Sequence, residues 1–343
     1  MRWIAVTLGR PLSRLVLHPI TLYFMLFGGP AARASADYLR RVLGRAPSWG
    51  ERYRHVHHFA ATILDRVYLL RGDFDLFDLE VVGAEHLDPV LQAGRGAFLV
   101  GAHLGSFEAL RALGEQRGGV RVAMLMYEQN AKLLTDTLRA IAPDAVQHII
   151  GLGRMEAMLE LRDWLDGGGV AGLLADRTLQ GPGQSSAAGR SRTHWIDFLG
   201  SPAAFSDGAF RLAALLRRPV VFMAGLYLGG GRYQLRFVPL ADFSDTRADR
   251  DAAVQDALRR YVGVLEQQCR EAPRNWFNFF DFWAGSPGPQ DTAHAAGWRQ
   301  RCSRPVSVKA WPPRRRRPAR CASPRCRRRR ASCALRGPAP GGR

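Results

Sequence analysis

The stretch GRGAFLVGAHLGSFEALRALGEQ, residues 94–116, decides how this chain of 343 residues folds and where its chemistry lies. Residues 97–101 form a short apolar run, which is typical of a buried strand. Gly101 and Gly105 permit a tight exit from the strand, and Ser106 can cap the helix expected over residues 106–116. The stretch therefore predicts a strand, a turn and a helix, a building block of α/β proteins.

The flanking sequence repeats this alternation. A long amphipathic helix is expected at residues 52–70 and a last helix at residues 250–270. Strands are expected at residues 79–82, 97–101, 120–126, 146–150, 170–175, 195–199, 220–226 and 233–238, with helices between them at residues 106–116, 130–141, 154–165 and 206–216. This pattern predicts a single α/β domain over residues 46–289, built on a mixed sheet flanked by helices.

His103 and Glu108 are the residues in this stretch that can do chemistry. On one regular helix an offset of five positions is a rotation of about 140°, so the two side chains would face apart. A strand, a loop and a helix can instead fold the carboxylate back onto the imidazole. A carboxylate on one ring nitrogen fixes the tautomer and leaves the other nitrogen to take a proton from a hydroxyl group. We therefore expect His103 as a general base and Glu108 as its partner, with nearby backbone N–H groups stabilising an oxyanion.

This motif, a histidine followed five positions later by Asp or Glu, resembles the catalytic motif of the lysophospholipid acyltransferase superfamily. Within that superfamily the sequence resembles the lipid A biosynthesis acyltransferase branch. The resemblance extends through much of residues 1–283, and it is especially close to predicted acyltransferases of glycolipid or polyketide-like lipid pathways. It is carried by Arg33, Ser35, Tyr38 and Leu39 and by the stretches LLADRT (173–178), FLGSPAAFSDGAFRLA (198–213) and NWFNFFDFW (275–283). Ser206 stands where many superfamily members have proline, which is a departure from the pattern.

The resemblance adds candidate substrate-binding residues to His103 and Glu108. These are Gly105, Ser106, Asp176, Arg177, Asp207 and Gly208. Asp176 and Arg177 follow the strand expected at residues 170–175, a position where α/β sheets bind ligands, and Arg177 could attract a phosphate or an acidic carrier. Asp207 and Gly208 begin a helix whose N–H groups could face substrate. The aromatic run at residues 276–283 stays unassigned.

The resemblance implies an O-acyltransferase. It would move a fatty acyl group from an acyl carrier protein or coenzyme A thioester to a hydroxyl of a lipid A-like or related glycolipid, with no metal and no further cofactor. A lysophospholipid or glycerol-phosphate acyltransferase is the alternative among enzymes, and a non-catalytic basic adaptor for membranes or nucleic acid is the alternative from another class. The absence of a GxSxG elbow disfavours an α/β serine hydrolase.

The first 45 residues read as a membrane-anchoring segment. Residues 12–27 are apolar but are interrupted by Arg14, His18 and Pro19, so they are marginal for a full span. A cleaved signal peptide ending near residues 34–36 is the alternative. We expect a retained anchor at the cytoplasmic face of the inner membrane, lying in the interface or dipping into the bilayer, in contact with anionic lipid.

The last segment, residues 290–343, has a different composition. It holds sixteen Lys and Arg against one acid, Asp291, and so carries +15 of the net charge of +19. It shows no hydrophobic periodicity, and we expect it to be disordered. An incidental extension, attraction to an anionic membrane and nucleic-acid binding are the interpretations open to it; nucleic acid is the least expected, since few aromatic residues interleave the arginines.

Overall fold

The computed structural model of the chain describes residues 2–116, 120–127, 148–177, 192–244 and 249–286. Within them a seven-stranded sheet has the order β1-β9-β8-β2-β5-β3-β4. Its strands are β1 (Asp78–Val82), β2 (Ala97–Gly101), β3 (Val122–Tyr127), β4 (His148–Leu152), β5 (Val170–Leu174), β8 (Pro219–Gly229) and β9 (Arg232–Asp242). The sheet is mixed, because β8 and β9 pair antiparallel while the other pairs are parallel. The expected mixed sheet flanked by helices is confirmed.

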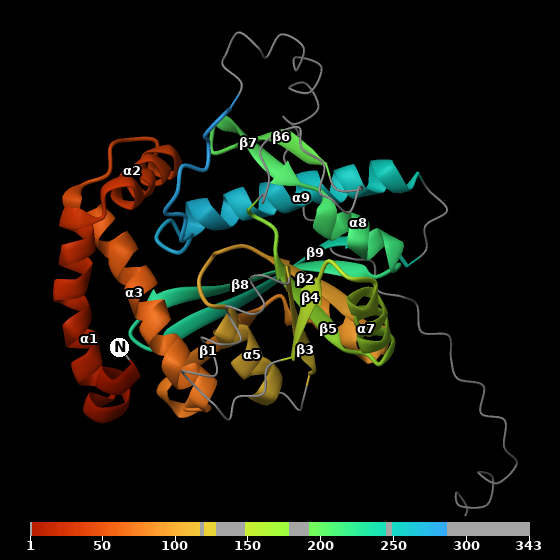
Figure 1. Cartoon of the computed structure of the whole chain (residues 1–343), viewed down its shortest axis with the longest axis horizontal. Coiled ribbons are helices and arrows are strands. Elements are labelled where there is room, and N and C mark those ends of the chain that lie inside the picture. Colours follow the sequence, from red (N-terminus) through yellow and green to blue (C-terminus); the bar gives the residue numbers. More distant parts are fainter. Residues whose placement is uncertain (1, 117–119, 128–147, 178–191, 245–248, 287–343) are drawn as a thin grey trace, which may run out of the picture. The chain divides into compact units, whose positions relative to one another are not determined.

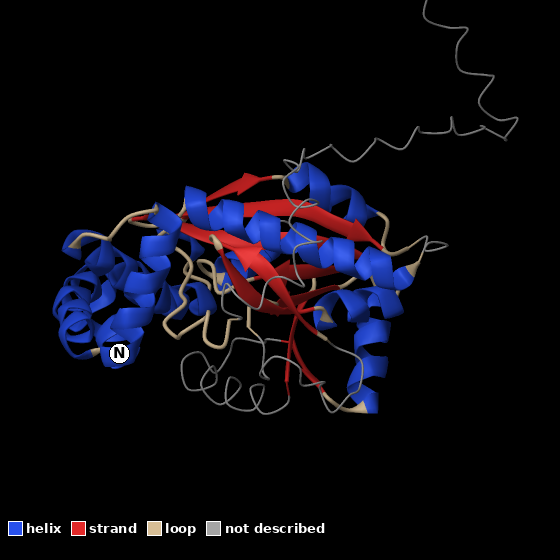
Figure 2. Cartoon of the chain, turned by 90° about the horizontal axis from the view of Figure 1, so that it is seen from above, coloured by secondary structure: helices blue, strands red, loops and turns tan. Residues whose placement is uncertain are grey.

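Helices cover both faces of this sheet (Figures 1 and 2). The described α-helices are α1 (Arg2–Phe27), α2 (Gly29–Leu43), α3 (Trp49–Arg71), α4 (Ala84–Gln92), α5 (Phe107–Gln116), α7 (Met155–Asp166), α8 (Gly208–Leu215) and α9 (Arg250–Glu271), of which α1 and α2 lie beside α3. A short 3-10 helix, η1 (Phe74–Leu76), precedes β1, and β6 (Thr193–Phe198) and β7 (Ser201–Ser206) form a separate antiparallel hairpin. Sequence patterns had not indicated α4 or β7, and the helix expected at residues 130–141 and the basic tail lie outside the described residues.

Strand β2 shows how the two faces are divided. Every residue of β2 is buried. Phe98 and Val100 belong to the core beneath α7, α8 and α9, whereas Ala97 and Leu99 belong to the core shared with α3, α5 and Leu17 of α1. Alternation along one strand thus supplies both cores, which explains why the sequence of β2 is continuously apolar rather than alternating.

Helix α1 is fixed to the rest of the domain by charged groups on its inner face. Arg10 donates from Nε and Nη2 to the two oxygens of Asp65 on α3, at 2.8 and 3.0 Å, and Asp65 is fully buried. The hydroxyl of Tyr233 also donates to Asp65, at 2.9 Å. Arg14 bonds the Tyr227 hydroxyl and the Gly230 carbonyl of the β8–β9 turn. These bonds hold α1 against α3 and the sheet.

No single described helix is long and apolar enough to cross a bilayer; the segments Gly9–Phe27 and Gly29–Leu43 pass that test only as a pair bent by 93°.

We predict that Asp65→Asn destabilises the domain by about 3–5 kcal/mol, because it removes one partner of a buried ion pair and leaves Arg10 without its counter-charge. The midpoint of urea unfolding measures the change. Asp37→Asn is the matched control, since Asp37 pairs with Arg40 and Arg41 on the surface of a helix and such pairs contribute only a few tenths of a kcal/mol. Equal effects of the two substitutions would contradict the anchoring role of Asp65.

Candidate functional site

The site lies where β2 and β5 end. The two strands are parallel neighbours, with Gly101 paired to Leu174. His103 and Asp176 each follow two residues later, so the same register brings them together at the carboxyl edge of the sheet. His103 Nδ1 lies 2.9 Å from Asp176 Oδ1, and the His103 backbone N–H donates to Asp176 Oδ2 at 3.0 Å. One carboxylate thus holds both the ring and the backbone of the histidine.

The two partners differ in their access to solvent. The side chain of Asp176 is 2% exposed and that of His103 is 32% exposed. Although burial of Asp176 opposes its charged form, the charge of His103 and hydrogen bonds from His103 and Trp276 hold the pKa of Asp176 below its ordinary value. Asp176 is therefore ionised at neutral pH. With Nδ1 engaged, Nε2 of His103 is the ring nitrogen left to act on a substrate.

Glu108 does not take the place expected for it. Its Oε1 lies 2.6 Å from Nη2 of Arg66 on α3, and its Oε2 accepts from the Ser106 hydroxyl at 3.3 Å. The imidazole of His103 has Asp176 as its carboxylate partner instead. The reason is topological: parallel pairing brings the end of β5 to His103, while the first turn of α5 directs Glu108 toward α3. The described residues show no hydrogen bond between Glu108 and the imidazole, so the expected pairing of these two side chains is not seen.

The turn between His103 and α5 is held by close backbone packing. The N–H of Gly105 donates to the Asn275 carbonyl at 2.9 Å, and the N–H of Ser106 donates to the Gly225 carbonyl at 2.8 Å. Gly105 has a φ of +76°, and a Cβ there would lie 1.9 Å from the Gly225 oxygen, so only glycine fits. These N–H groups and that of His103 already have acceptors, so these three are not free to bind an oxyanion, and stabilisation by other nearby N–H groups stays a prediction.

Arg177 follows Asp176 directly in the chain, beyond the end of β5. Its side chain is exposed, and its guanidinium carbon lies 5.0 Å from the centroid of the Phe280 ring. A planar cation held on an aromatic ring and open to solvent suits a phosphate or a carboxylate.

Asp207 and Gly208 form a separate cluster. Asp207 is fully buried and accepts from the Arg192 N–H at 2.7 Å and from Arg211 Nε at 2.8 Å, and it lies 3.0 Å from His194 Nε2. The Gly208 N–H, which we expected to face substrate, donates to the Ser206 hydroxyl at 3.2 Å. Within the described residues no hydrogen bond or ion pair joins this cluster to His103. Ser206 thus supplies an acceptor for the first N–H of α8 that proline would lack.

Trp276 is the site residue that the sequence did not single out. Its indole Nε1 donates to Asp176 Oδ2 at 2.9 Å, although it lies 100 positions away. The next N–H, that of Phe277, donates to the His103 carbonyl at 2.7 Å. The only available signal was the density of aromatic residues at 276–283, which does not tell a core from a site.

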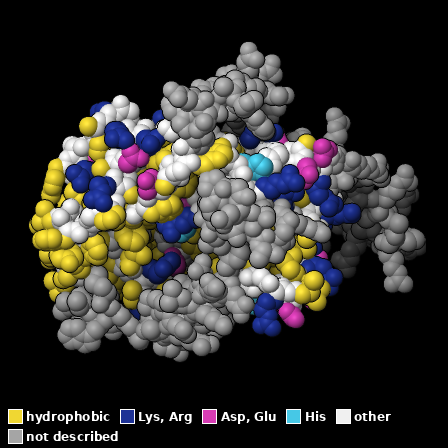
Figure 3. All heavy atoms as spheres, turned by 45° about the horizontal axis from the view of Figure 1, so that its top comes forward, with side chains coloured by type: hydrophobic (Ala, Val, Ile, Leu, Met, Phe, Trp, Pro, Cys, Tyr) yellow, Lys and Arg dark blue, Asp and Glu magenta, His cyan; other side chains and the backbone are white. Residues whose placement is uncertain are grey.

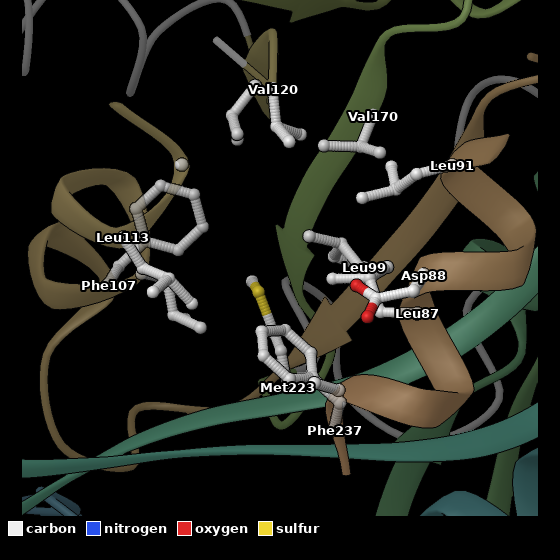
Figure 4. Close-up of a pocket in the computed structure, with 14 residues that line it drawn as sticks. Leu87, Asp88, Leu91, Leu99, Phe107, Leu113, Val120, Val170, Met223 and Phe237 are labelled. Carbon is white, nitrogen blue, oxygen red and sulfur yellow. The ribbon is translucent and has the colours of Figure 1, made fainter. Parts of the chain in front are cut away.

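An apolar cavity lies between α4 and α5 on one face of the sheet (Figure 4). Leu87 and Leu91 of α4 face Phe107 and Leu113 of α5 across it. Its volume is about 50 Å³, far below the roughly 300–1,000 Å³ of sites that enclose a drug-sized ligand. In this conformation the cavity does not hold a long acyl chain.

Fold and site together define an α/β enzyme with a histidine–carboxylate pair at the carboxyl edge of its sheet. Residues 71–284 match the model of the bacterial lipid A biosynthesis acyltransferase family, and the chain belongs to this family. The match spans β1 to the aromatic segment and includes His103, Glu108, Asp176 and Trp276. A search of curated proteins gives no significant match to the chain. The protein is therefore an acyltransferase of a family that acts on lipid acceptors.

We predict that Asp176→Asn lowers kcat by roughly 10²–10⁴-fold, because the neutral amide cannot stabilise the protonated imidazole or fix its tautomer. Glu108→Gln should lower kcat less than tenfold and act mainly on stability, through its lost ion pair with Arg66. Acyl-transfer kinetics and urea unfolding of both variants separate these effects. A larger loss of kcat in Glu108→Gln would restore Glu108 as the partner of His103.

Proposed function

We propose that the protein transfers a fatty acyl group from an acyl carrier protein or coenzyme A thioester to a hydroxyl of a lipid A-like or related glycolipid. The partly exposed His103, bonded through Nδ1 to the buried Asp176, carries this proposal. Nε2 takes the proton of the acceptor hydroxyl while the hydroxyl oxygen attacks the thioester carbonyl. The tetrahedral intermediate then expels the thiolate, which leaves as the thiol after taking a proton from the imidazolium.

The remaining residues receive supporting roles. Asp176 stabilises the imidazolium that forms during the attack. Arg177, exposed on the ring of Phe280, binds a phosphate of the acceptor or of the donor's phosphopantetheine arm. Glu108 fixes Arg66 and the turn at Ser106 rather than the imidazole. This chemistry requires no metal, since the base and the leaving group exchange the proton directly.

We predict that the wild type transfers labelled acyl groups from carrier thioester into extractable lipid and that His103→Ala loses at least about 100-fold of that rate, as expected for a general base. Activity should persist in EDTA. Acyl carrier protein and coenzyme A donors are compared side by side, with glycolipid, lysophospholipid and glycerol phosphate as acceptors.

His86→Ala serves as the control, since His86 lies on α4, where its Nε2 is 3.8 Å from Oε1 of Glu85. Undiminished transfer by a folded His103→Ala variant would exclude His103 as the base. Transfer by a chain ending at Pro289 would separate the enzyme from an adaptor that acts through its basic tail.

We further propose that the enzyme works at the cytoplasmic face of the inner membrane and that the outer face of α1 contacts the bilayer. Leu12, Leu15, Leu22, Tyr23 and Leu26 recur at helical spacing and are 41–63% exposed. Hydrophobic side chains gather over the N-terminal helices in Figure 3. Uncharged apolar area of this kind is typical of a helix lying in the membrane interface. Arg10 and Arg14 hold the opposite face on the domain, which favours a helix lying on the membrane over one crossing it.

We predict that Leu15→Glu with Leu26→Glu lowers binding to phosphatidylcholine vesicles at least tenfold, because each buried Leu contributes roughly 1.5–3 kcal/mol. Sedimentation with vesicles measures the change, and neutral lipid removes the contribution of the basic tail. Met155→Glu, which alters an exposed apolar residue on α7, should bind like the wild type. Adding phosphatidylglycerol should strengthen binding at low salt. Unchanged binding by the double variant would exclude α1 as the contact.

A further inference from the structure

The carboxylate of Asp176 is held by more than the histidine. Oδ1 faces His103 Nδ1 at 2.9 Å, whereas Oδ2 accepts from the His103 backbone N–H at 3.0 Å and from the Trp276 indole at 2.9 Å. Trp276 is fully buried, so its N–H has no water to bond in place of Asp176. An indole is a donor only, and a buried one usually finds an acceptor.

The backbone of Trp276 is fixed from the opposite side by α2 and α3. His55 is fully buried, and burial lowers its pKa to about 4, so it is neutral at pH 7. A carbonyl only accepts, so His55 Nε2 carries the proton and donates to the Trp276 carbonyl at 2.9 Å. Nδ1 then accepts from the Ser35 hydroxyl at 2.8 Å. A chain of hydrogen bonds thus runs from α2 through Trp276 to Asp176 and His103.

Packing alone does not explain a tryptophan here. Its ring meets Tyr38, Phe198 and Phe282 at centroid distances of 4.9, 5.3 and 4.9 Å, and these ring contacts do not account for the direction of the indole N–H. Trp283 in the same cluster shows the contrast, because its indole Nε1 is buried with no hydrogen-bond partner in the described part of the chain. Of the two tryptophans, only Trp276 directs its indole N–H at the carboxylate of Asp176.

We propose that Trp276 is a positioning residue of the acyl-transfer site. Its indole N–H donates to Oδ2 of Asp176 and so directs Oδ1 toward His103. The inference rests on the proposed function of His103 as general base. With both the Trp276 indole and the His103 backbone N–H donating to Oδ2, the carboxylate is held from rotating away from Nδ1. The indole donor withdraws part of the carboxylate's charge, which keeps the imidazole from holding its proton too tightly.

Other groups near Asp176 do not replace this contact. Burial, with the charge of Asp176 as a further cause, raises the pKa of both Tyr261 and Cys269 on α9, so they are neutral at pH 7. Arg177 is a cation next to Asp176 in sequence, but its guanidinium lies on Phe280. Tyr261 donates to the Gly101 carbonyl at 2.9 Å. Trp276 is therefore the neutral side-chain donor that bonds Asp176 in the described structure.

The test compares Trp276→Phe with Trp283→Phe in the full chain. Trp276→Phe should lower kcat roughly 10- to 100-fold, the usual effect of losing a hydrogen bond to a charged group, with KM nearly unchanged because Trp276 acts through Asp176. The acid limb of its pH–rate profile should move to higher pH, since a carboxylate with one donor fewer holds the imidazolium more strongly. Trp283→Phe should keep the wild-type profile.

A second readout does not depend on activity. The indole ¹H–¹⁵N signal that disappears in Trp276→Phe is assigned to Trp276. It should be protected from exchange in the resting enzyme and should shift in Asp176→Asn. The indole signal of Trp283 should not shift in Asp176→Asn. A Trp276→Phe variant with the rate and pH profile of Trp283→Phe, or an indole signal indifferent to Asp176→Asn, would overturn the inference. An inactive wild type would refute the proposed function and leave the indole measurement to decide the contact.

Discussion

The parallel pairing of β2 with β5 is the constraint on which the site depends. It is buried on both faces, and its register places His103 and Asp176 at equivalent positions beyond the strand ends. Both side chains then meet at one edge of the sheet without any special loop. Asp176 is buried because the aromatic segment after α9 closes over it, and that burial strengthens its interaction with His103. A shift of one residue in this pairing would direct one of the two side chains to the opposite face of the sheet.

The N-terminal helices belong to the working domain, although the family match begins only at residue 71. His55 on α3 bonds the carbonyl of Trp276, and Arg66 on α3 neutralises Glu108. The buried Asp65 then ties α1 to the same helix. A helix fixed by such bonds on one side and apolar on the other can carry the enzyme on a membrane surface while holding parts of the site in place. Helix α3 would then connect the lipid contact proposed for α1 to the catalytic site.

Much of the fold follows from local pattern. The continuous apolar run of β2, the glycines around it and the capping Ser106 predict a strand, a turn and a helix, and the structure has them there. Strands shifted by a few residues, such as β4 and β9, lie within the ordinary uncertainty of such boundaries. The sequence does not predict helix α4, because Pro89 lies inside its nine residues. Strand β7 is not predicted because its sequence, SPAAFS, shows little apolar alternation and the strand is stabilised by its pairing with β6.

The sequence by itself determined the α/β class, the family, the motif with His103 and the position of Asp176 after a buried strand. These follow from hydrophobic periodicity and from residue spacing, which are local properties of the chain. Only the tertiary structure decided which carboxylate reaches the imidazole. That choice depends on which strands are neighbours in the sheet, and strand order is set by the packing of the whole domain. The same holds for Trp276, whose bond to Asp176 spans 100 residues and exists because α9 returns the chain to the edge of the sheet.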